Sequence, residues 1–184
     1  MNWLLLPDLL CLLVCAIGAV TDLREYRIPN WLTGSGVLLG LIVNYAVIAA
    51  YLGPAAGFRL GLGHAALGAA VLFAVFGLFG LLRLVGLGDV KLMAAVGALL
   101  RWPLALWALV YVVLAGGLLA LVVAALRGRL KATFSGLFRR GTRAVERDEE
   151  GFPAAAHRLP YGVAILLGVG WAVAARYVPA LRIP

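Results

Sequence analysis

Charged residues are scarce in this sequence, at 13% of its 184 positions, whereas 64% of the residues are hydrophobic and the mean hydropathy is +1.03. A soluble domain of this length could not bury so much apolar surface in one core. The shortage of charge therefore excludes a soluble globular protein. It predicts a chain that has the lipid bilayer as its solvent.

Cysteine is also rare. Cys11 and Cys15 lie one helical turn apart in an apolar segment, and the sequence has no C-x-x-C pair. This spacing argues against a zinc site and against a disulfide framework, so we expect packing or lipid-facing thiols and no metal. The sequence also lacks an internal repeat and a low-complexity tract. We therefore expect a single membrane domain over residues 1–184.

Six apolar segments are separated by polar, glycine-rich or proline-containing stretches. A spanning helix needs roughly 20 mainly apolar residues, and five segments approach that length, at residues 3–20, 31–51, 64–82, 104–126 and 161–178. Residues 90–100 would give only about 17 Å of helix, which is tolerated at membrane depth where protein or water satisfies the polar groups. The pattern predicts an all-α polytopic membrane protein with about six transmembrane helices, the fourth of them short.

Two further features refine this prediction. Residues 3–20 have neither a preceding basic region nor a following small-residue cleavage site, so we expect a permanent helix and not a signal peptide. In the second segment, Gly36 and Gly40 form a small-xxx-small pattern that predicts close helix packing.

Lysine and arginine are distributed unevenly between the two sides that six alternating spans define. Twelve of the 16 basic residues fall in the loops after the first, third and fifth segments. The positive-inside rule places these loops in the cytoplasm and both termini outside it. The formal charge of +8 therefore sets membrane orientation, and we expect no nucleic-acid partner.

Residues 127–160 form the one sizeable aqueous loop. Between residues 130 and 143, apolar side chains recur at helical spacing among basic ones. This predicts either an amphipathic helix in the membrane interface or a solvated basic loop. Residues 146–150 hold 4 of the 8 acidic residues, and they are either a docking site for a basic peptide or simply solvated.

Acidic residues inside or beside membrane helices need an explanation, because their ionised forms are costly there. Asp8 lies beside Pro7 near the outer end of the first span, within reach of the interface or water, and we interpret it as structural. Asp22 ends the same span, where the negative end of the helix dipole disfavours its anionic form. A surface ion pair with Arg24 or Lys91 is the simpler alternative for Asp22, worth about 0–1 kcal/mol.

Asp89 follows Gly86-Leu87-Gly88, directly before the short fourth segment. On this motif alone Asp89 is an N-cap residue in an ordinary glycine loop. Its place at the same membrane edge as Asp22 suggests instead two carboxylates that share one proton. Such a pair can hydrolyse a peptide, and the helix ends favour ionised Asp89 and neutral Asp22. The glycines would let backbone approach an extended substrate.

Three motifs in order resemble those of the prepilin peptidases, which are GxGD aspartic proteases. They are Asp22 followed by Ile28-Pro29-Asn30, then Gly86-Leu87-Gly88-Asp89-Val90-Lys91, and finally Pro160-Tyr161-Gly162-Val163-Ala164-Ile165. The resemblance implies an intramembrane endopeptidase that removes the basic leader of type IV prepilin or pseudopilin precursors at the cytoplasmic face of the inner membrane. It implies Asp22 and Asp89 as the catalytic residues and no cofactor.

The other motif residues have scaffolding roles on simple physical grounds. Pro29 restrains a turn, and Asn30 caps the second span. Pro160 suits the first turn of the last span, and Lys91 pairs with a carboxylate or a phosphate headgroup. The supporting residues are Gly86, Gly88, Lys91, Pro29, Asn30, Pro160, Tyr161 and Gly162.

Larger bifunctional members of the family carry an additional N-terminal region with cysteines that is associated with N-methylation. The first apolar segment here starts at residue 3, so we expect the short peptidase-only form, as in tight-adherence pilus systems. Archaeal preflagellin peptidases share the motif. Two other classes stay open: a small transporter or channel component that uses Asp22 and Asp89 as an ion or proton relay, and a non-catalytic secretion scaffold.

Overall fold

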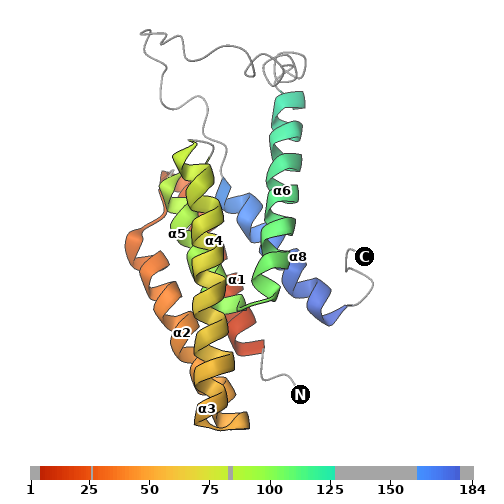
Figure 1. The fold of residues 1–184 in the computed structure, drawn as a ribbon. Coiled ribbons are helices and arrows are strands. Elements are labelled where there is room, and N and C mark those ends of the chain that lie inside the picture. The colour runs from red at the N-terminus through yellow and green to blue at the C-terminus, as the bar shows by residue number, and fades with distance from the viewer. Residues whose placement is uncertain (1–4, 26, 83–84, 127–160, 179–184) are drawn as a thin grey trace.

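The computed structural model describes residues 5–25, 27–82, 85–126 and 161–178, and these residues form helices and no strand. The elements in chain order are α1 (Leu5–Glu25), α2 (Asn30–Leu52), α3 (Pro54–Ala56), the π-helical η1 (Gly57–Gly63), α4 (His64–Leu81), α5 (Leu87–Leu100), α6 (Leu104–Leu126) and α8 (Tyr161–Tyr177) (Figure 1). The predicted all-α architecture is confirmed. The interfacial helix or loop predicted over residues 127–160 lies outside the described residues.

Four helical segments are long and apolar enough to cross a membrane, namely Leu5–Glu25, Asn30–Leu52, Pro54–Leu81 and Leu104–Val123. α8 has 17 residues, and α5 has 14, or about 21 Å of helix. The chain is therefore a polytopic membrane protein, and its fourth apolar segment is short, as predicted.

The third span begins earlier than the sequence pattern predicts, at Pro54 and not at residue 64. Gly53 ends α2 with a φ of +88°, a conformation that glycine adopts without steric cost. Pro54 occupies the first turn of the next helical segment, where its missing N–H costs little. Because one residue makes the turn, α3, η1 and α4 follow α2 without a loop, and Arg59 lies on a helix.

α5 lies at the centre of the bundle, packed mainly against α4, α2 and α1 (Figure 1). Every residue from 92 to 100 is buried. A Cβ added at Gly36 would lie 2.9 Å from Cβ of Ala95, and one at Gly40 would lie 2.7 Å from the carbonyl carbon of Ala98. The close packing predicted from these two glycines is confirmed, and it holds α2 directly against α5.

The C-terminal end of α5 is buried between helices, and Asn44 of α2 satisfies its last carbonyls. Asn44 is 1% exposed. Its Nδ2 lies 3.0 Å from the carbonyl oxygens of Ala98 and Leu99 and 2.9 Å from that of Gly40 in its own helix, so its two N–H groups are shared among three acceptors. Water cannot replace such donors inside a bilayer. This capping amide allows α5 to end far short of a full span.

Replacing Asn44 with leucine should lower the free energy of unfolding by about 1–3 kcal/mol, because the carbonyls of Ala98 and Leu99 lose their donor. The measurement is denaturant-induced unfolding in mixed lipid–detergent micelles. Ser35→Ala is the matched control, since the Ser35 hydroxyl donates only to Leu32 of its own helix. Equal stability of Asn44→Leu and the wild type would show that Asn44 is not needed to cap α5.

Candidate active site

α1 and α8 run antiparallel and in contact. At each end of this helix pair, a carboxylate of α1 accepts a hydrogen bond from α8. At one end, Asp22 accepts a hydrogen bond from the backbone N–H of Gly162. At the other, Asp8 accepts hydrogen bonds from Arg176 and Tyr177. Asp22 lies about four helical turns after Asp8, so both side chains share one face of α1. The two acids of this helix therefore belong to different sites.

Asp22 lies at the N-terminus of α8. Its Oδ2 is 2.9 Å from the backbone nitrogen of Gly162, the second residue of α8. That N–H has no partner within its own helix, and the positive end of the α8 dipole favours a carboxylate beside it. Asp22 therefore satisfies a backbone N–H that α8 leaves unpaired. We predicted neutral Asp22 from the dipole of α1 alone, and the structure adds a second helix end, that of α8, beside the same carboxyl.

Gly162 permits this contact because it has no side chain. An added Cβ would lie 3.1 Å from Cβ and from Oδ2 of Asp22, and 3.1 Å from Cα of Ala19. Few real Cβ contacts are this short. The glycine of the third motif is thus explained by the close approach of α8 to the end of α1.

Asp89 is the third residue of α5, and Gly86 is the N-cap, so the prediction of Asp89 as the N-cap was wrong by three positions. Asp89 is 8% exposed, and its Oδ2 accepts the backbone N–H of Gly86 at 3.2 Å. A Cβ at Gly86 would lie 3.1 Å from this oxygen, and one at Gly88 would lie 3.2 Å from Cβ of Ile28. The two glycines make room for the Asp89 carboxyl and for the residue before Pro29.

The electrostatic surroundings of Asp89 favour a proton on its carboxyl. Asp89 lies in the first turn of α5, outside the helices that are long enough to span. Burial is the main cause and the negative charge of Asp22 the second cause of a raised pKa of Asp89, and the hydrogen bond from Gly86 lowers it, with a net value of about 6. Asp89 therefore keeps its proton to a higher pH than an ordinary aspartic acid does.

The three predicted motifs meet at one end of the bundle. The charge of Asp22 reaches Asp89, and the charge of Asp89 reaches Tyr161 at the start of α8. Tyr161 also touches α6, because a Cβ at Gly116 would lie 2.6 Å from its hydroxyl oxygen. Pro160 lies outside the described residues.

Lys91 and Asn30 join α5 to α2 beside this end. Lys91 Nζ donates to Asn30 Oδ1 at 2.9 Å, so its partner within the described residues is an amide and not a carboxylate, and the pairing with a headgroup stays a prediction. Asn30 is the first residue of α2, makes no capping hydrogen bond and follows an extended Pro29 N-cap. The predicted capping role of Asn30 was also wrong. The Asn30 amide oxygen instead accepts the hydrogen bond from Lys91.

A cavity of about 350 Å³ lies next to the Lys91–Asn30 contact, between α2, α4 and α5. The polar part of its lining consists of Asn30, Thr33 and Lys91. The apolar part includes Val37 and Phe73. A peptide segment that is polar at one end and apolar at the other would match the polar and apolar parts of this lining.

The remaining acid and the cysteines are structural. Asp8 is 1% exposed and forms an ion pair with Arg176 at 3.0 Å, so it lies in the protein interior and does not reach water. Cys11 and Cys15 are free thiols with 0% exposure, which makes them packing residues and not lipid-facing ones. No local pattern in the sequence indicates Arg176 and Tyr177 as the partners of Asp8.

Comparison with known proteins gives a match to a family model. The model describes the type IV leader peptidase family and matches residues 9–121. The matched region contains Asp22, Pro29 and the segment from Gly86 to Lys91, and it ends before α8. No curated protein and no solved structure matches the chain.

Proposed function

This chain belongs to the type IV leader peptidase family, and on that basis we propose that it is an intramembrane aspartic endopeptidase. Its substrates are type IV pilin-like precursors, from which it removes the basic leader. The observation that carries the proposal is the proximity of two carboxyls, Asp22 and Asp89, at one end of the bundle. They lie 67 positions apart in sequence, and the negative charge of Asp22 acts on Asp89. Two interacting carboxyls with separated proton affinities are what peptide hydrolysis without a metal requires.

The proposed mechanism assigns the base to Asp22 and the acid to Asp89. Ionised Asp22 takes a proton from water as the water oxygen attacks the scissile carbonyl carbon, and Asp89 gives its proton to the carbonyl oxygen. The tetrahedral intermediate then returns a hydroxyl proton to Asp89. As the C–N bond breaks, Asp22 protonates the leaving nitrogen. Both carboxyls finish in their starting states.

We also propose where the aspartate pair lies relative to the membrane. The excess of basic residues in the first, third and fifth loops supports a cytoplasmic position for the aspartate pair, at the inner membrane, with both termini outside the cytoplasm. The cavity beside Lys91 offers apolar walls to the membrane-embedded part of a precursor and polar groups near the cleavage site. We limit the proposal to peptide cleavage.

The experiment that tests this function uses the purified wild-type protein in liposomes with a pilin-like precursor, followed by mass spectrometry of the products. We expect two fragments whose masses add up to the precursor plus one water. The matched control is the same precursor without its basic leader, which should remain intact. A folded wild-type protein that leaves the precursor uncut, while it conducts ions across the liposome membrane, would favour the relay function instead.

The pH dependence of cleavage tests the assignment of acid and base. Asp89 must be protonated to donate, so kcat/KM should fall as pH rises through the pKa of Asp89, about 6, by about tenfold for each further pH unit. The measurement is kcat/KM between about pH 4.5 and 8.5. Glu25→Gln removes an exposed acid at the same end of α1. Its kcat/KM should fall with rising pH over the same range as that of the wild type. A rate that rises through the same range would make Asp89 the base.

A further inference from the structure

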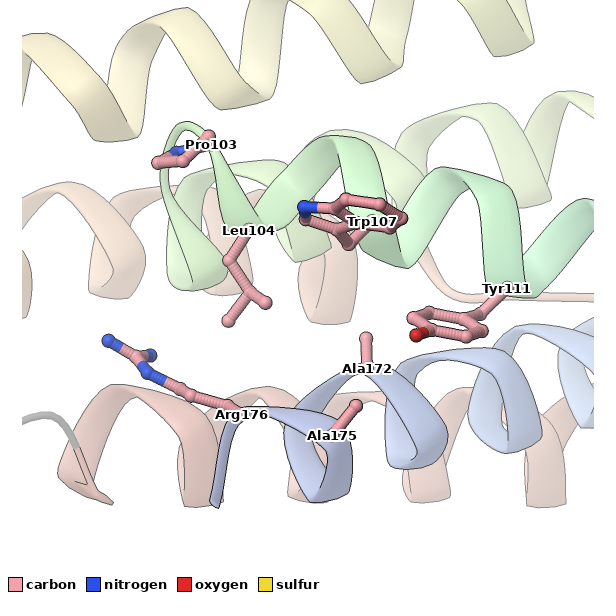
Figure 2. Close-up of a pocket in the computed structure, with 7 residues that line it drawn as sticks. All are labelled: Pro103, Leu104, Trp107, Tyr111, Ala172, Ala175 and Arg176. Carbon is pink, nitrogen blue, oxygen red and sulfur yellow. The ribbon is translucent and has the colours of Figure 1, made fainter. Parts of the chain in front are cut away.

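A cavity of about 400 Å³ lies between α6 and α8, toward the end of the bundle opposite the aspartate pair. Figure 2 shows Leu104 and Tyr111 reaching from α6 toward Ala172 and Ala175 on α8, with Arg176 at the end of α8 nearest the turn before α6. The walls are mainly apolar, and the volume lies within the roughly 300–1,000 Å³ that is usual for ligand sites. The arrangement is that of an apolar slot with a cation at one end.

Aromatic rings surround this cavity. The centroid of Tyr111 lies 6.4 Å from that of Trp107 on α6 and 6.3 Å from that of Trp171 on α8. Trp107 is 45% exposed and Trp171 is 50% exposed, so both indoles face the surroundings of the bundle. Tryptophan and tyrosine gather at the level of lipid headgroups. The cavity therefore opens where the hydrocarbon core meets the headgroups.

Among the residues that the structure describes, the charges at this end do not balance. Both carboxylate oxygens of Asp8 accept hydrogen bonds from Arg176, at 3.0 and 3.1 Å. Arg101, in the turn between α5 and α6, is partly buried and lies within electrostatic reach of both residues. Among the described residues, no carboxylate forms an ion pair with Arg101. Arg101 lies two residues before Pro103, which lines the slot, so two arginines and one aspartate leave one positive charge near that end of it among the described residues.

We propose that this slot binds one anionic phospholipid from the leaflet opposite the aspartate pair. An acyl chain lies between α6 and α8, and the phosphate lies at Arg101. A guanidinium binds a phosphate through two parallel hydrogen bonds, and the surplus positive charge selects an anionic headgroup over a zwitterionic one. This site is separate from the aspartate pair, so the proposed peptidase function stands or falls without it.

The test is native mass spectrometry of the full chain released from detergent in the presence of phosphatidylglycerol or phosphatidylcholine. We expect one bound phosphatidylglycerol for each wild-type chain. Arg101→Gln should weaken its retention about tenfold, the loss of one charge-assisted contact. Leu104→Trp should fill the slot and abolish binding of either lipid. Arg59→Gln is the matched control, since it removes an exposed arginine from η1 and should leave binding unchanged.

Several outcomes would overturn the proposal. If Arg59→Gln reduces binding as much as Arg101→Gln does, the lipid responds to overall charge and not to this site. If inorganic phosphate displaces the bound lipid, the site is one for a free anion. If Leu104→Trp separates a dimer instead of releasing a lipid, a second copy of the chain occupies the slot. If deleting residues 179–184 is required before lipid binds, the chain's own end fills it. Thermal unfolding of each variant shows whether it is folded.

Discussion

Asp22→Asn and Asp89→Asn should each lower kcat/KM for precursor cleavage by roughly 10³- to 10⁴-fold, within the range for loss of a general acid or base. Asparagine keeps nearly the same shape, and at position 22 its carbonyl oxygen can still accept the N–H of Gly162. What it loses is the ability to take up and release a proton. The measurement is single-turnover cleavage of a pilin-like precursor, with equal amounts of each folded variant in the membrane.

Two comparisons make this prediction specific. Glu25→Gln removes an exposed acid three residues beyond Asp22, and it should cleave at the wild-type rate. The double variant should be about as slow as either single variant, because residues that act as one unit have non-additive effects. Near-normal cleavage by either single variant would make that aspartate structural and refute the proposed mechanism.

Arg176→Leu should lower the free energy of unfolding by about 3 kcal/mol, the scale for a buried charge that loses its partner. Asp8 is 1% exposed, so its carboxylate cannot turn to water when the guanidinium is removed. The Tyr177 hydroxyl, 2.7 Å from Asp8 Oδ2, would remain and would keep the loss near the lower end of the usual range. The measurement is equilibrium unfolding in lipid–detergent micelles.

The second substitution in this test removes the acid as well. Asp8→Asn combined with Arg176→Leu should recover a large part of the lost stability, because a buried amide costs less than a buried unpaired carboxylate. Arg59→Leu, at an exposed position in η1, should change stability by less than about 0.5 kcal/mol. An Arg176→Leu protein as stable as the wild type would show that Asp8 needs no cation.

The helices could be predicted from the sequence because the signals for them are local. Runs of apolar residues of nearly membrane length mark α1, α2, α6 and α8, and the 14-residue α5 stands out by its shortness. The pattern of Gly36 and Gly40 predicted close packing, which the contact with α5 confirms. Only the turn at Gly53 and Pro54 was misread, since the glycine-rich residues 54–63 continue a helix and do not form a loop.

The side-chain partners could not be predicted in the same way, because they depend on which helices become neighbours. The bond from Gly162 to Asp22 joins residues 140 positions apart, and the bond from Arg176 to Asp8 joins residues 168 apart. The donor for α5, Asn44, is 54 positions before the carbonyl that it caps. Nothing in the local pattern around an acid states which helix end will lie beside it. This is why the sequence favoured ionised Asp89, whereas burial and the neighbouring Asp22 raise the pKa of Asp89 in the structure.

The bond between Asp22 and Gly162 also imposes an order on biosynthesis. A ribosome completes both aspartates when it has made about half of the chain, yet α8 is the last of the described helices to emerge. Until then Asp22 lacks the N–H of Gly162 as its partner. For a peptidase with this arrangement, we expect competence only after α8 has been made and inserted.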